Sequence, residues 1–86
     1  MEQLALFLLD MDARLSRRGE IHLPMRRRQI GDYLGRRIES VSRTFSAFHK
    51  AKIIDFLDNP VIQRLVVIRD RRRLERLASD ASDFHF

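Results

Sequence analysis

Three side chains near the middle of the sequence, Glu39, Ser42 and Arg43, have the chemistry needed to recognise base pairs. An arginine can donate two hydrogen bonds to guanine O6 and N7, a carboxylate can accept one from cytosine N4, and a serine can contact either kind of base edge. If these residues lie on a helix and Val41 faces the protein core, all three project outwards near the N-terminal end of that helix. We therefore expect them to read bases in the major groove of double-stranded DNA.

The acid in this group has a simpler alternative role. Glu39 and Arg43 are four residues apart, so they could form an ion pair along one helix without any contact to DNA. The two roles are compatible, because such a pair would also hold the arginine in place for reading a base.

Positive charge is concentrated around these residues. The segment 26–52 contains eight Lys or Arg and two acids, whereas the rest of the chain contains nine basic and ten acidic residues. A basic zone on a folded chain favours an acidic partner, and nucleic acid is the usual one. A solvated basic surface with no partner is the alternative.

The spacing of Gly31, Gly35 and Val41 matches the needs of a helix-turn-helix. The first helix needs a small residue where the second packs across it, and the turn needs a left-handed residue, for which glycine is the least costly. The second helix needs an apolar residue that faces the first. An αα-hairpin with no role in DNA binding is the alternative.

The remaining elements follow from hydrophobic periodicity and turn signals. The inner faces of the three predicted N-terminal helices are expected to hold Leu4, Leu8, Met11 and Leu15, then Ile30, Tyr33 and Leu34, then Ile38, Val41, Phe45 and Phe48. The first elements are a helix over 2–18 ended by Arg17-Arg18-Gly19, an extended piece over 21–23, and helices over 26–34 and 38–51. Two strands follow, over 53–57 and 65–68, joined by a tip over 58–64. The last helix starts at 70, is capped by Asp70 and buries Leu74, Leu77 and Ala78, and we expect the tail from 79 to be frayed.

The predicted fold class is mainly α with a small β-hairpin, a winged helix-turn-helix. We expect one domain over 1–86, with the helix-turn-helix at about 26–51, the wing at about 53–69 and a C-terminal helix at about 70–79.

Several other classes of function are not expected. The chain has no cysteine, and its three histidines (His22, His49 and His85) show no metal-ligand spacing, so we expect no metal and no cofactor. His49 is expected at the surface or against the wing. No catalytic set is recognisable, so an enzyme is not expected. The longest apolar stretch, 4–9, is too short to cross a membrane. We expect a cytoplasmic protein.

The sequence resembles the C-terminal domain of Crp/Fnr-family transcription regulators. The resemblance rests on Leu23-Pro24-Met25, on 30–35 (Ile-Gly-Asp-Tyr-Leu-Gly) and on 39–43 (Glu-Ser-Val-Ser-Arg), and it covers nearly the whole chain. The Glu-x-x-Ser-Arg pattern is similar to that of the Fnr and FixK branch.

This resemblance implies sequence-specific binding to half-sites of the TTGA type, with Glu39, Ser42 and Arg43 on bases. It also implies phosphate contacts near the two helix N-termini, from Arg26, Arg28, Arg37 and Ser40. Arg27 is nearby in the sequence and is also expected to contact phosphate. RNA polymerase is a further candidate partner, and a homodimer is expected if a dimerisation helix lies outside this chain.

Four positions depart from the family pattern. Arg26 and Arg37 stand where a capping Ser or Thr is usual, Arg36 where an apolar residue is usual, and Lys52 where a glycine is expected to end the helix. Each change adds positive charge, and a lost cap costs about 1 kcal/mol. The alternative function is therefore a winged-helix module for protein interaction or dimerisation, with weak or no specific DNA binding.

Overall fold

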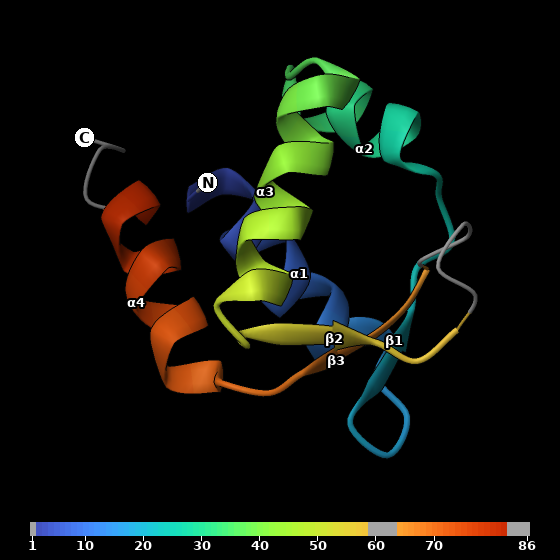
Figure 1. Cartoon of the computed structure of the whole chain (residues 1–86), viewed down its shortest axis with the longest axis vertical. Coiled ribbons are helices and arrows are strands. Elements are labelled where there is room, and N and C mark those ends of the chain that lie inside the picture. Colours follow the sequence, from blue (N-terminus) through green and yellow to red (C-terminus); the bar gives the residue numbers. More distant parts are fainter. Residues whose placement is uncertain (1, 59–63, 83–86) are drawn as a thin grey trace.

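Four helices pack with a small three-stranded sheet in this computed structural model, which describes residues 2–58 and 64–82 (Figure 1). In chain order the elements are α1 (Glu2–Leu15), β1 (Glu20–His22), α2 (Arg27–Leu34), α3 (Ile38–Lys50), β2 (Ile54–Phe56), β3 (Leu65–Ile68) and α4 (Arg71–Ser82). The predicted fold class is confirmed. The described part contains no helix that is long and apolar enough to cross a membrane.

The sheet has the strand order β1-β3-β2, and both strand pairs are antiparallel. Ile21 lies opposite Val66 in one pair, and Phe56 lies opposite the same valine in the other. The segment predicted only as extended is therefore a third strand of the sheet. Of the predicted wing, 53–69, the tip residues 59–63 lie outside the described residues.

The chain enters β1 through a tight turn that the sequence did not predict. The backbones of Arg17 and Glu20 exchange two hydrogen bonds of 2.9 Å. Between them Arg18 and Gly19 both have positive φ, 56° and 80°. This combination is typical of a two-residue type I′ turn. The turn explains why α1 ends at Leu15 and not at the predicted residue 18.

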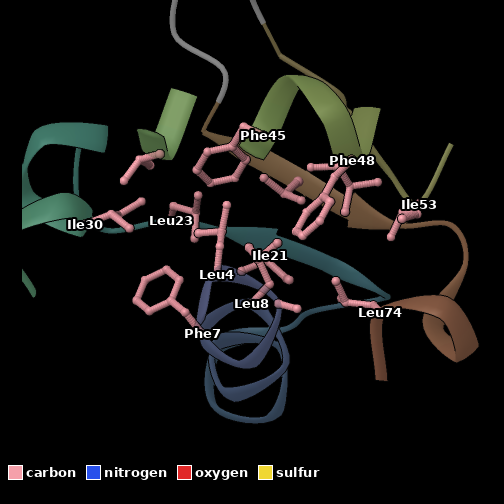
Figure 2. Packing of buried hydrophobic residues seen from close by; sticks show 14 of the residues in the cluster. Leu4, Phe7, Leu8, Ile21, Leu23, Ile30, Phe45, Phe48, Ile53 and Leu74 are labelled. Atoms are coloured by element: carbon pink, nitrogen blue, oxygen red, sulfur yellow. The ribbon is translucent and has the colours of Figure 1, made fainter. Parts of the chain in front are cut away.

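One cluster of buried apolar side chains holds the elements together, and α1, α2, β1, α3 and α4 all contribute to it (Figure 2). Its three phenylalanines are its largest members, and of these Phe45 and Phe48 of α3 are almost fully buried. The sheet contributes Ile21 of β1 to the cluster, and α4 contributes Leu74. The inner face of α3 is therefore fixed by packing, and its opposite face is left to solvent.

Two predicted core residues are wrong. Leu15 is 42% exposed because it ends α1, and Tyr33 is 71% exposed with its ring against Phe7 at a centroid distance of 5.9 Å. Phe7, which was not on the predicted inner face, is buried instead. Leu34, Ile38 and Met11 are half-buried.

The last helix agrees with its predicted cap. The backbone N–H of Arg73 donates to Asp70 Oδ1 at 3.1 Å, Leu74 and Ala78 are buried, and Leu77 packs against the core. The helix continues to Ser82, so the predicted frayed tail begins too early. Residues 83–86 lie outside the described residues.

Candidate nucleic-acid interface

The turn between α2 and α3 has the geometry that its glycines require. Gly35 has φ 69°, and its N–H points back to Asp32 O at 3.4 Å, while Arg36 N–H donates to Gly31 O at 2.8 Å. These two bonds and the left-handed residue form a Schellman motif, which ends α2 sharply. The left-handed conformation predicted for Gly35 is confirmed.

Gly31 allows the turn to approach α2 closely. An ideal Cβ at this position would lie 2.7 Å from the carbonyl oxygen of Arg36, closer than any real side chain can approach. The prediction of a required small residue is confirmed. The atom that enforces it belongs to the turn and not to α3.

Val41 has only 3% of its surface exposed, and its burial sets the rotation of α3 about the helix axis. Because Val41, Phe45 and Phe48 face the core, the neighbouring positions on the helix face outwards. Glu39 and Arg43 are exposed and Ser42 is half-buried. The structure therefore brings the three predicted base-reading residues together on the N-terminal half of α3.

Glu39 and Arg43 carry opposite charges one turn apart on the exposed side of α3. Within the described residues no ion pair joins them. Both charged groups are therefore directed to solvent, and each is available to a ligand.

Four of the five predicted phosphate contacts are exposed at the starts of α2 and α3. Arg26 precedes α2, Arg28 lies in its first turn, Arg37 precedes α3, and Ser40 lies in the first turn of α3. Neither Arg26 nor Arg37 caps its helix with a side-chain hydrogen bond. Gln29 partly compensates on α2, because its Oε1 accepts the backbone N–H of Arg26 at 2.8 Å.

The fifth, Arg27, is placed differently. It is half-buried, and its guanidinium carbon lies 4.9 Å from the ring centroid of Phe45 and 5.7 Å from that of Phe56. Burial lowers the pKa of this guanidinium below its usual value, although the group remains charged at neutral pH.

Sequence reasoning missed two polar links of this region. Arg36 Nε donates to Gln3 Oε1 of α1 at 2.7 Å. The arginine that stands in place of the usual apolar residue therefore joins the turn to the N-terminal helix. Arg64, just before β3, donates from Nε and a terminal nitrogen to the Leu23 carbonyl at 3.0 and 2.9 Å. Both links join residues distant in sequence, so no local pattern could have predicted them.

His49 packs against the wing, as predicted. Its ring and that of Phe56 form a T-shaped contact at a centroid distance of 5.4 Å, and its Nε2 lies 3.3 Å from Asp55 Oδ1. Among the described residues there is no cluster of three or more His, Cys, Asp or Glu that could hold a metal.

Comparison with known proteins identifies the fold and the family. The Crp-like helix-turn-helix domain family matches residues 2–77. The transcriptional activator protein FnrA of Stutzerimonas stutzeri is 41% identical over 58 residues, which cover 63% of this chain and 24% of that protein. Electron transport regulator A of Shewanella oneidensis is 34% identical over 84 residues, which cover 93% of this chain and 32% of that protein.

Solved structures agree with these relatives. FixK2 from Bradyrhizobium japonicum has a TM-score of 0.81 and 47% sequence identity, over 88% of this chain and 36% of that one. The transcription factor CooA from Carboxydothermus hydrogenoformans, at 22% identity and a TM-score of 0.75, supports the fold alone.

The chain thus spans about a quarter to a third of the length of the curated relatives it matches. These relatives are named as a transcriptional activator and as a regulator of electron transport, which agrees with the expectation that the chain is not an enzyme. The chain belongs to the Crp-like helix-turn-helix domain family, in its Fnr/FixK branch, and is a DNA-binding domain of the transcription-regulator type.

Proposed function

We propose that this domain reads one half-site of the TTGA type, with the N-terminal half of α3 in the major groove. The observation that carries the proposal is the exposed pair Glu39 and Arg43, held outwards by the buried Val41. The G·C pair of such a half-site offers guanine O6 and N7 to Arg43 and cytosine N4 to Glu39. Ser42 is then adjacent to a thymine edge.

Phosphate contacts position α3 in this proposal. The residues expected to make them are exposed and lie at the starts of two helices: Arg26, Arg28, Arg37 and Ser40. Their charges and hydroxyl would fix the register of the domain on the duplex without reading its sequence. Arg27 is predicted as a phosphate contact from the sequence alone, and it differs from the other four because its guanidinium lies over the rings of Phe45 and Phe56.

The partners of the whole regulator also belong to the proposal. Two copies would read the two halves of a palindrome if a dimerisation helix lies outside this chain, and RNA polymerase would be the partner in activation. The regulator would be located in the cytoplasm, because it must reach the chromosome to bind its sites. A single domain contacts one half-site, so binding should be weak and steeply dependent on salt.

A fluorescence-anisotropy titration at low, fixed salt tests the reading face. The probes are a labelled duplex with a TTGA palindrome and a scrambled duplex of equal length. The unmodified domain should prefer the palindrome. Arg43→Ala should remove about 1–3 kcal/mol of binding free energy from the palindrome alone, whereas the matched control Arg28→Ala should weaken both duplexes alike.

Equal affinity of the unmodified domain for both duplexes would exclude sequence reading. If in addition no binding occurs at low salt while light scattering shows self-association, the interaction-module alternative is correct. The exposed Tyr33 beside Phe7 is the apolar surface that such a module would use.

A further inference from the structure

Arg27 differs from the arginines around it because its charged group lies on aromatic rings and not in open solvent. The guanidinium carbon is within 6 Å of the centroids of both Phe45 and Phe56, the range in which a cation is attracted to a ring face. Arg26 and Arg28, its neighbours in sequence, are both exposed.

The two rings belong to different parts of the domain. Phe45 is a core residue of α3, and Phe56 is the last residue of β2, the first strand of the wing. Their centroids are 5.9 Å apart, and the centroid of the His49 ring lies 5.4 Å from that of Phe56. Arg27, in the first position of α2, therefore links both helices of the helix-turn-helix to the wing.

Holding a half-buried cation at this place needs a reason other than contact with DNA. Burial removes water from the guanidinium, and its pKa falls accordingly. The negative faces of the two rings replace part of the lost hydration. A phosphate contact would be better served by an extended, exposed side chain such as that of Arg28.

We propose that Arg27 is a positioning residue that holds strand β2 of the wing against the helix-turn-helix, and that it is not a phosphate contact. The role in DNA binding rests on the proposed function, because it presumes that α3 lies in the major groove. Packing of β2 against α2 and α3 holds the reading face in place before DNA binds, so less order has to be gained at the moment of binding.

Salt dependence separates the two roles. Each phosphate contact that is lost reduces the slope of log K against log salt by about 0.9. Arg27→Met should leave this slope unchanged while weakening binding to the palindrome about tenfold. The matched control Arg28→Met should reduce the slope by about one.

Amide hydrogen exchange of the free domain gives a second readout that needs no DNA. Arg27→Met should speed exchange of the amides in Ile54–Phe56 and Leu65–Ile68 about tenfold, and Arg28→Met should leave it unchanged. Arg27→Lys should keep the salt slope but not restore protection fully, because lysine lacks the planar group that covers two rings. Far-UV circular dichroism establishes that each variant is folded.

Two results would overturn the proposal: a slope reduced by about one in Arg27→Met, or unchanged exchange in both strands. If the unmodified domain binds neither duplex, the proposed function fails, and with it the role in DNA binding. The exchange comparison then still decides whether Arg27 holds the wing strand.

Discussion

Lys52 ends α3 in a conformation that suits glycine, and replacing it should stabilise the domain. Its φ is 60°. Its N–H donates to His49 O and the N–H of Ile53 to Phe48 O, at 3.0 and 2.9 Å. These are the two bonds of a Schellman motif with lysine in the left-handed position. The end of α2 contains the same motif with Gly35, so the chain provides its own reference.

The expected gain follows from two opposing terms. A residue with a Cβ loses roughly 1–2 kcal/mol in the left-handed region. Glycine loses about 0.5–1 kcal/mol more than alanine through the flexibility of the unfolded chain. Lys52→Gly should therefore raise the free energy of unfolding by about 0.5–1 kcal/mol. For a chain of 86 residues this corresponds to a rise in Tm of about 3–6 °C.

The charge must be separated from the backbone effect, since a cation near a helix C-terminus is itself mildly stabilising. Lys52→Ala removes the charge and keeps the Cβ, so it is the matched control. Urea unfolding followed by circular dichroism should place Lys52→Gly about 1 kcal/mol above Lys52→Ala. If the glycine variant is no more stable than the alanine variant, the left-handed strain argued for Lys52 is absent.

Three further variants test local features by the same urea unfolding. Gly31→Ala should lose about 1–2 kcal/mol, although alanine is the better helix former, because its Cβ would meet the Arg36 carbonyl at 2.7 Å; an unchanged midpoint would mean that the turn shifts freely. Asp70→Ala should lose about 1 kcal/mol with the hydrogen bond to the Arg73 N–H, and a neutral result would show that the cap contributes nothing. Arg26→Ser should gain about 1 kcal/mol by restoring a cap and should weaken binding to both duplexes; increased affinity would contradict its role at phosphate.

The helix-turn-helix was predictable because its rules are local. Gly35 supplies a left-handed turn and Val41 an inward residue, and both requirements can be recognised within a few positions of the chain. The outward direction of Glu39 and Arg43 follows from Val41 by helix geometry alone. No side chain from a distant element covers these two exposed residues in the described part of the chain, so their placement agrees with the sequence.

Errors arose where the outcome depended on distant partners. Periodicity identifies the apolar face of a helix but not how far along it the neighbouring elements extend, so Leu15 and Tyr33 were wrongly placed in the core. The pairing of β1 with β3 joins segments far apart in sequence and has no local signal. The half-buried placement of Arg27 likewise has no local signal, because its ring partner Phe56 lies on the wing.

Glu39 has a role in helix stability in addition to its proposed role in base reading. Helix α3 begins without a side-chain cap because Arg37 occupies that position, and a cation there opposes the helix dipole. Glu39 is the acid in the first turn of α3, so its charge offsets part of this cost. The carboxylate that could accept from cytosine therefore also helps to hold the start of the recognition helix. Loss of DNA binding in a Glu39 variant is evidence of base reading only if α3 is shown to stay folded. Arg43 lies beyond the first turn and is free of this ambiguity, which makes it the sharper test of base reading.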